Sequence, residues 1–485
     1  MKKYILLLFF VVLCGCSIKQ PHKEVIRIRL KEDPTTLDPA RIVDVAGASA
    51  AAKIYNGLAK INEKGDTVPD LAESWNVSLD GKEYTFKLRK NIRFTDGSPL
   101  VAKDIVNAFN RVVNKSPRKW IFNNVSEIKV LDDYTLRILL KERFTPFIEM
   151  LALPTAYISK EGNVGTGPYK LIMWEHDKRI VLEENKYYFG DIPKINHIEY
   201  IILPDEFSAQ AEFELGNIDI MEVSPIQWKT LIKWKETPKQ FSQTGLNIYY
   251  IGFDLRKPLF QNLRFRQAMN YAIDRELIIK SVLVGQAEPA FAPVPPCLLQ
   301  TKKKFYYKFL PNKSRKLFNA MMLENPVRLY VRAQAQAIQI AEAIQYYLGK
   351  AGVRIIIVPL EWSAFKSAID NGECDMFLMS WWADYPDPEN FLFPTFHSSN
   401  IGGGGNRSYF KNKAIDKLIE TAQKEMDANK RNELYETLNR YLNRYAPWLF
   451  LWNAKELYIT QGNIEGFRLY PLYYGDKGIE IEIKN

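Results

Sequence analysis

The chain has 485 residues, a formal net charge of +10, and 47% apolar, 25% charged and 13% aromatic residues. This composition excludes a disordered chain, because that class has too few aromatic and apolar side chains to form a core. At roughly 100–200 residues per domain, the length predicts two to four structural units. The densest basic run, TKKKF at 301–305, is too short for a nucleic-acid stripe, so we expect no nucleic-acid partner.

The N-terminus has the pattern of a secretory leader. MKKY is a short basic start, ILLLFFVVL is an apolar run, and LCGC supplies small residues that end at Cys16. The run is shorter than the ~20 residues of a membrane-spanning helix, so we expect residues 1–15 to be removed as a signal peptide. The ending is similar to a lipobox, which implies that Cys16 carries a lipid that tethers the protein to a membrane surface. An ordinary signal with a chance cysteine is the alternative.

A β-hairpin followed by a helix is predicted next. In SWNVSLDGKEYTFKLRKNIRF (74–94), apolar residues alternate on both sides of the turn pair Asp80-Gly81. The helix is expected to begin with Ser98 as its cap and Pro99 in its first turn. Apolar residues then follow at helical spacing: Val101, Ile105, Phe109 and Val112.

Parallel strands are predicted in the second half of the chain. Residues 325–362 show a strand, a helix that ends at Gly349 and Gly352, and the apolar strand VRIIIVPL. This order is that of a right-handed βαβ unit, which implies a parallel sheet covered by helices. A long amphipathic helix is expected over 413–444, with a break near Asp427. Because hairpins and βαβ units coexist, the predicted fold class is α/β with mixed sheets.

Motifs that would indicate an enzyme are missing. The four histidines form no HExxH or other close pair, so no metal site is expected. There is no Walker phosphate loop, GxSxG or GxGxxG, and two SxxK matches lack the motifs that accompany penicillin-type chemistry. We therefore expect neither an enzyme nor a bound cofactor. Cys297 and Cys374 give no framework pattern and are expected to be unpaired.

The stretch SWWADYPDP (380–388) places aromatic side chains around one carboxylate, Asp384. In one interpretation, Trp381 packs in the core and Asp384 caps a turn before Pro386. In the other, the aromatic side chains wall a cleft in which Asp384 pairs with a buried cation, which needs such a partner.

A series of blocks extends along nearly the whole mature chain: DPTTLDPARIVD (33–44), VPDLAESWNVSLDGKEYTFKLRKNIRFTDGSPLVAKDIVNAFNRV (68–112), GTGPYKL (165–171), ENKYYFG (184–190), ELGNIDI (214–220), NLRFRQAMNYAIDRELI (262–278) and GECDMFLMSWWADYPDPENFL (372–392). With these blocks in this order, the chain resembles family 5 of the bacterial extracellular solute-binding proteins, the oligopeptide- and dipeptide-binding lipoproteins of ABC importers.

The resemblance implies a class II periplasmic-binding-protein fold, in which two lobes close on a ligand about a hinge and an additional domain is inserted in the first lobe. Mixed β-sheets flanked by helices are expected. Lobe I would comprise 16–43, 166–247 and 455–485, the inserted domain 44–165, and lobe II 248–454.

The resemblance also implies a function. A lipid-anchored monomer, in the periplasm or at the outer face of the cell membrane, would capture oligopeptides between its lobes. It would then deliver them to an ABC permease and its ATPase subunits. One alternative keeps the fold and changes the cargo to murein peptide, a nickel chelate, haem or a sugar oligomer. Another, from a different class, is an envelope hydrolase or adhesin.

In the family, the acid that matches Asp384 pairs with the ammonium of the peptide. Ser380, Trp381 and Trp382 would lie on the strand whose backbone binds the peptide as an added strand. Trp362 matches a cleft tryptophan that packs on a ligand side chain.

Further polar contacts are expected from Asn406 and from Tyr249 or Tyr250. Some members anchor the peptide carboxylate with an arginine at the position that Leu378 occupies here, so that anchor is missing. Arg332, near the end of its predicted strand, is the candidate replacement.

Overall fold

The computed structural model describes residues 25–161, 163–231, 238–299, 307–321, 325–403 and 405–484. The predicted signal peptide, Cys16 and the basic run 301–305 lie outside the described residues. The names lobe I, inserted domain and lobe II are used below for the residue sets predicted above.

One mixed sheet extends through both lobes, with its strands in the order β16-β15-β17-β13-β18-β11-β1-β10-β9-β8, and β12 and β14 also pair with β18. The lobe I strands are β1 (Val25–Leu30), β8 (Tyr169–Glu175), β9 (Arg179–Glu184), β10 (His197–Ile202), β11 (Ile220–Glu222) and β12 (Lys239–Thr244). The lobe II strands are β13 (Asn247–Phe253), β14 (Ala287–Pro289), β15 (Val327–Arg332), β16 (Ile355–Leu360) and β17 (Met376–Trp382). Parallel and antiparallel pairs coexist, as the predicted α/β class requires.

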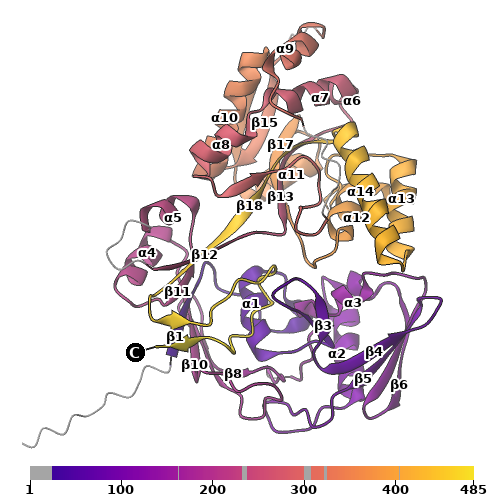
Figure 1. Cartoon of the computed structure of the whole chain (residues 1–485), viewed down its shortest axis with the longest axis vertical. Helices are drawn as coiled ribbons and strands as arrows, with labels where there is room; N and C mark the ends of the chain where they lie inside the picture. The colour runs from indigo at the N-terminus through magenta and orange to yellow at the C-terminus, as the bar shows by residue number, and fades with distance from the viewer. Residues whose placement is uncertain are drawn as a thin grey trace, which may run out of the picture.

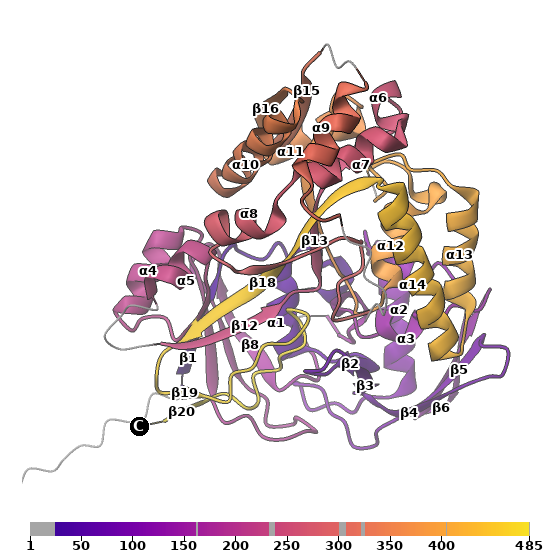
Figure 2. The same ribbon diagram turned by 45° about the horizontal axis from the view of Figure 1, so that its top comes forward.

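Helices cover this sheet. Lobe I carries α4 (Glu206–Glu214) and α5 (Pro225–Leu231). Lobe II carries α6 (Pro258–Gln261), α7 (Leu263–Ala272), α8 (Arg275–Val282), α9 (Pro311–Asn319), α10 (Ala335–Ala351), α11 (Trp362–Asp370), α12 (Glu389–Phe396), α13 (Lys413–Lys424), α14 (Ala428–Tyr445) and the 3-10 turn η4 (Ser398–Asn400). The C-terminal strands β19 (Ile464–Glu465) and β20 (Glu482–Ile483) form a separate two-stranded sheet within lobe I (Figure 2).

The inserted domain forms its own layer below α13 and α14 (Figure 1). Its four-stranded antiparallel sheet has the order β4-β5-β7-β6. Its elements are α1 (Val45–Ile54), β2 (Ala59–Ile61), β3 (Thr67–Pro69), β4 (Ala72–Val77), β5 (Glu83–Leu88), α2 (Ala102–Lys115), β6 (Val125–Asp132), β7 (Thr135–Leu140), α3 (Phe147–Met150) and the 3-10 turns η1 (Pro39–Arg41, just before it), η2 (Lys119–Phe122) and η3 (Pro154–Ala156). Although the sequence places α1 here, this helix contacts β8 of lobe I.

Several predicted elements are confirmed. The hairpin is β4 and β5, and β15, α10 and β16 form the βαβ unit with parallel strands. The long C-terminal helix is broken between α13 and α14, where Asp427 caps α14. Cys297 and Cys374 are both free thiols.

The predicted start of α2 is wrong. The helix begins at Ala102, and Asp104 accepts a hydrogen bond from the backbone N–H of Val101 at 2.9 Å. Ser98 does not cap it, because a β-bridge between Arg93 and Pro99 holds this segment in a turn. The Ser98 hydroxyl instead donates to Asp96.

The strand β18 (Trp448–Thr460) connects the two lobes (Figures 1 and 2). Residues 448–454 pair with β13 and β14, and residues 455–460 pair with β12, with β11 on the other side. Its first six residues are all buried, in agreement with the apolar run WLFLWN. The partners of β18 thus change between Ala454 and Lys455, which makes this point a pivot.

The side chain of Asn247 clamps the pivot. Its Oδ1 accepts from the Ala454 N–H at 2.8 Å, and its Nδ2 donates to the Ala454 carbonyl at 3.0 Å. Gly245 is required beside it, because a Cβ at this position would lie 2.4 Å from the Asn247 Nδ2. The buried amide of Asn247 therefore replaces a ladder interaction where the strand changes partners.

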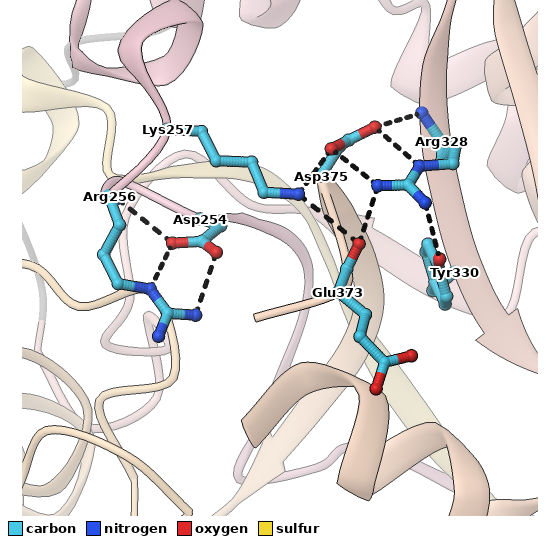
Figure 3. Close-up of polar contacts among 7 residues, drawn as sticks. All are labelled: Asp254, Arg256, Lys257, Arg328, Tyr330, Glu373 and Asp375. Carbon is cyan, nitrogen blue, oxygen red and sulfur yellow. Dashed lines mark hydrogen bonds and ion pairs between the residues drawn. The ribbon is translucent and has the colours of Figure 1, made fainter. Parts of the chain in front are cut away.

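A second cluster fixes the end of β17 that is remote from the pivot (Figure 3). Asp375 accepts from Lys257 Nζ at 2.6 Å and from Arg328 Nε at 3.2 Å. Burial by itself raises the pKa of Asp375, but the hydrogen bonds from Arg328 and Lys257 outweigh burial and hold it below its usual range. The Glu373 carboxylate points away from these basic groups (Figure 3).

Replacing Asn247 should loosen the pivot selectively. In Asn247→Ala the buried Ala454 N–H loses its acceptor, which costs about 1–3 kcal/mol. Amide hydrogen exchange at Ala454 should therefore become about tenfold faster or more. The exposed Asn371→Ala is the control, and equal exchange at Ala454 in both variants would contradict the clamp.

Replacing Asp375 should destabilise lobe II in a pH-dependent manner. Because the folded-state pKa is depressed, the carboxylate contributes stability above its unfolded pKa of about 3.9, and this contribution is lost as the pH falls through the folded pKa. Asp375→Asn should lower the free energy of unfolding by about 1–3 kcal/mol at pH 7, and the deficit should shrink below pH ~4. Urea unfolding measures both values, with the neighbouring Glu373→Gln as a control that should change little. A deficit that is the same at both pH values would contradict this assignment.

Candidate functional site

The last residues of β17 have a free edge. On one side, β13 pairs along the whole strand, from Phe253 opposite Met376 to Asn247 opposite Trp382. On the other side, β15 pairs only at Met376 and Phe377. Among the described residues, the backbone from Leu378 to Trp382 therefore has no strand partner on the β15 side. Such an edge can accept an added strand.

Asp384 follows this edge and lies where the lobes meet. Its backbone N–H donates to Asn390 Oδ1 at 2.8 Å, and its carbonyl accepts from the Tyr474 hydroxyl at 2.6 Å. Tyr474 belongs to lobe I, so the loop of Asp384 is bound by both lobes. The side chain is about one-quarter exposed.

The carboxylate of Asp384 pairs with Arg118 of the inserted domain, with Nη1 and Oδ1 2.8 Å apart. Burial by itself lowers the pKa of Arg118, but the Asp384 carboxylate outweighs burial and raises it. Arg118 also donates to the Val43 carbonyl at 3.4 Å. An ion pair between lobe II and the inserted domain thus occupies the position where the sequence predicted a cation for Asp384.

The two motif tryptophans differ in their surroundings. Trp381 is partly buried against the large core and donates from Nε1 to the Asn390 carbonyl at 2.8 Å. Trp382 is 44% exposed at the end of β17. Asn390 therefore holds both Trp381 and the Asp384 backbone, a supporting role that sequence reasoning missed although the residue lies in the matched block.

A second group of predicted residues gathers around Arg332. The guanidinium of Arg332 lies 4.6 Å from the ring centroid of Trp362, which is 38% exposed. Ser380 is opposite Tyr249 in the β13–β17 ladder. The charge of Arg332 lowers the pKa of Tyr249, although burial dominates and raises it.

Two predicted residues are in the core instead. Tyr250 is 1% exposed, and its ring stacks on Trp448 with the centroids 3.5 Å apart. Asn406 is fully buried, and its amide is used by the backbone of Phe410 and the carbonyl of His397. Neither side chain is available to a ligand, and only Tyr249 of the tyrosine pair remains a candidate.

Leu378 is also in the core. It belongs to the lobe II cluster, whereas Trp381 packs against the other cluster, in agreement with the alternation of side chains along a strand. Any side chain at position 378 would point away from Trp381. The leucine side chain has no hydrogen-bond donor, so the arginine anchor that some family members have at this position is missing here.

The inserted domain and lobe II also meet at a second place. The Thr145 N–H donates to the Gln423 carbonyl at 2.8 Å, and its hydroxyl donates to the Glu425 carbonyl at 3.0 Å. Lys424 and Glu142 form an exposed ion pair with N and O 2.5 Å apart. These contacts join the two parts at the turn between α13 and α14.

Between these contacts lies a buried group of carboxyls. Glu149 of α3 faces Asp387 and Arg431 of lobe II, and Glu389 lies nearby with Tyr385 as its hydrogen-bond donor. Burial, together with the charge of Asp387, raises the pKa of Glu149 and of Glu389 to about 7. Burial also raises the pKa of Asp387, against the charge of Arg431.

This group should make the closed arrangement more stable in mild acid. A carboxyl whose folded-state pKa is raised contributes stability that is fully present below its unfolded pKa and is lost as the pH rises through the folded pKa. For Glu149 this window extends from about 4.5 to about 7. The groups that face it are the Asp387 carboxyl, the Arg431 guanidinium and the Tyr84 phenol, whose pKa burial raises to about 12.

Glu149→Gln should therefore stabilise the protein at pH 8 by about 1–3 kcal/mol and have little effect at pH 4.5. Urea midpoints at both pH values measure this difference. The exposed Glu433→Gln should change neither midpoint. A loss of stability at pH 8 in Glu149→Gln would show that the ionised carboxylate is stabilising.

None of the helices in the described part of the chain has the length and apolar character needed to cross a membrane.

Comparison with known proteins agrees with this architecture. The chain is 28% identical to the heme-binding protein A of Haemophilus influenzae, over 91% of this chain and 89% of that protein. It is 27% identical to the dipeptide-binding protein of Escherichia coli, over 87% and 88% of the two chains. The crystal structure of NikA from Brucella suis in complex with Fe(III)-EDTA has the same fold, with a TM-score of 0.86 at 23% identity, over 95% of this chain and 100% of that one.

Residues 66–403 match the model described as bacterial extracellular solute-binding proteins, family 5 Middle. The proteins of this family bind solutes and are not enzymes. With two lobes joined at β18 and a match across most of its length, the chain belongs to family 5 of the bacterial extracellular solute-binding proteins.

Proposed function

We propose that this protein is the peptide-capturing component of an ABC importer and that Asp384 receives the ammonium group of the cargo. The placement of the Asp384 carboxylate carries the proposal. It lies in the contact between lobe II and the opposite side of the cleft, 2.8 Å from a cationic nitrogen of Arg118. An ammonium group has the same charge and donor chemistry, and it needs such a partner when closure removes it from water.

The free edge of β17 supports a peptide as the cargo. A peptide added along Leu378 to Trp382 would satisfy its backbone hydrogen bonds independently of its side chains. With its ammonium at Asp384, the peptide would run antiparallel to β17, on the side that β15 leaves open. The exposed ring of Trp382 is at the start of this path.

Arg332 is suited to the other end of the peptide. It is the last residue of β15, so its guanidinium is at the point where β15 stops covering the edge. Extending the β15–β17 register brings Arg332 opposite Met379, about five residue steps from Asp384. At about 3.3 Å per residue this is roughly 17 Å, which suits a peptide of about three to five residues. Trp362 would then pack on one of its side chains.

We propose further that Cys16 carries a lipid and that the cargo is passed to a permease with its ATPase subunits. The signal-like leader and the cysteine at its end support the anchor. The proposal also includes that the protein is a monomer and that it lies in the periplasm or at the outer face of the cell membrane.

Removing the charge of Asp384 tests the ammonium site. Asp384→Asn should weaken the binding of a tetrapeptide with a free amino group by about 10–150-fold, because a charged hydrogen bond contributes about 1.5–3 kcal/mol. The same peptide with an acetylated amino group should bind the two proteins about equally. Isothermal titration calorimetry gives both constants, and equal losses for the two peptides would remove Asp384 from this role.

The nature of the cargo is tested separately. Native mass spectrometry of the protein as purified should show a spread of bound masses if it carries peptides. A single bound mass would favour a nickel chelate, haem or one murein peptide and would contradict a general peptide receptor. Conversion of a peptide during incubation would indicate the hydrolase alternative.

A further inference from the structure

The ion pair between Arg118 and Asp384 joins two groups that the cleft brings together from opposite sides. Only Oδ1 of Asp384 takes part in the hydrogen bonds between described residues, so Oδ2 remains available. A guanidinium has five N–H donors, and two hydrogen bonds of Arg118 are present, to Asp384 and to the Val43 carbonyl. Both side chains therefore have unused hydrogen-bonding capacity.

Among the described residues, Asp384 is the carboxylate that forms an ion pair with Arg118. A small cavity beside it has mostly apolar walls: Ile42, Val43, Ala48, Leu153, Pro154, Thr155 and Tyr473, together with Asp44. The Asp44 carboxylate is held by neutral donors, with Oδ1 accepting from the Gly47 N–H at 2.6 Å and Oδ2 from the Thr35 hydroxyl at 2.5 Å. The direct ion-pair partner of Arg118 is Asp384.

This pairing limits the cargo that can enter. An ammonium alone would add a second positive charge beside the single carboxylate of Asp384, so one positive charge would stay unbalanced in a partly buried position, which is costly. An ammonium that arrives with a carboxylate replaces one ion pair by two, and no charge remains unbalanced. Arginine forks bind a carboxylate through two parallel N–H bonds, a geometry that a single oxygen of a peptide carbonyl cannot match.

We propose that Arg118 is a specificity residue for a carboxylate on the same carbon as the ammonium that Asp384 receives. The preferred cargo then ends in a free α-amino acid headgroup, as in a peptide joined through the γ-carboxyl of a leading glutamate. In an ordinary α-linked peptide, that carbon bears a neutral amide in place of the carboxylate. This inference rests on the proposed function, in which Asp384 faces the cargo.

Two isomers provide a matched test. γ-Glu-Gly and α-Glu-Gly have the same atoms and the same net charge, but only the γ-linked isomer has its ammonium and a free carboxylate on one carbon. The wild-type protein should bind γ-Glu-Gly about tenfold or more tightly than α-Glu-Gly, because a bidentate charged contact is gained. Titration calorimetry on the full mature chain gives the ratio.

Variants of Arg118 assign the effect. Arg118→Gln should abolish the preference for the γ-linked isomer by weakening that isomer alone. Arg118→Lys, which keeps the charge and loses the fork, should retain part of it. Arg137→Gln on β7 is the matched arginine control and should keep the full ratio, and circular dichroism verifies that each variant is folded. Asp384→Asn should weaken both isomers.

The outcomes separate this inference from the proposed function. If the two isomers bind equally, or if Arg118→Gln weakens both to the same extent or neither, Arg118 has no such role. In that case binding of α-linked peptides that depends on Asp384 would leave the peptide function intact. If neither these isomers nor a tetrapeptide binds the wild-type protein, both proposals fail.

Discussion

The fold depends on one strand that belongs to both lobes. Residues 448–454 of β18 are hydrogen-bonded in lobe II and residues 455–460 in lobe I, so the lobes cannot separate without rotation near Ala454. The ladder would be interrupted at this point, and the Asn247 amide fills the gap. The position of every cleft residue follows from this constraint, because β13 and β17 are aligned on β18 in turn.

Charge governs how the two sides of the cleft meet. At Asp384 a carboxylate and a guanidinium of opposite charge come together. At Glu149, by contrast, two carboxyls, Glu149 and Asp387, share one guanidinium and Glu389 lies nearby, so burial favours the protonated forms of all three. The Asp384–Arg118 ion pair is compatible with neutral pH. At the same pH, ionisation of the buried carboxyls around Glu149 destabilises the contact between the inserted domain and lobe II. A receptor that must open again to release its cargo benefits from such a balance, because closure then lies within reach of a cargo's binding free energy.

The sequence predicted local structure wherever periodicity or turn chemistry was strong. The hairpin around Asp80-Gly81, the βαβ unit and the break at Asp427 follow from short-range rules, and Asp384 was singled out by its unusual neighbours. Arg118 was not predicted as a site residue, because its partner Asp384 is 266 residues away and no local sequence pattern connects the two. Tyr250 and Asn406 were predicted as ligand contacts, but both are buried. In a short segment, a polar side chain does not reveal whether it faces the core or the solvent. The start of α2 was misjudged because Ser98 competes with a tertiary bridge.

The unpaired length of β17 has a consequence for the protein between cargoes. A bare strand edge is a template on which another chain can add its own strand and begin aggregation. Here β15 covers one end, and Pro386 and Pro388 follow closely at the other, so the open stretch is only about five residues long. Short edges and flanking prolines are the devices by which sheet proteins avoid self-association. The short length of the open edge thus protects the unloaded protein from association with its own copies.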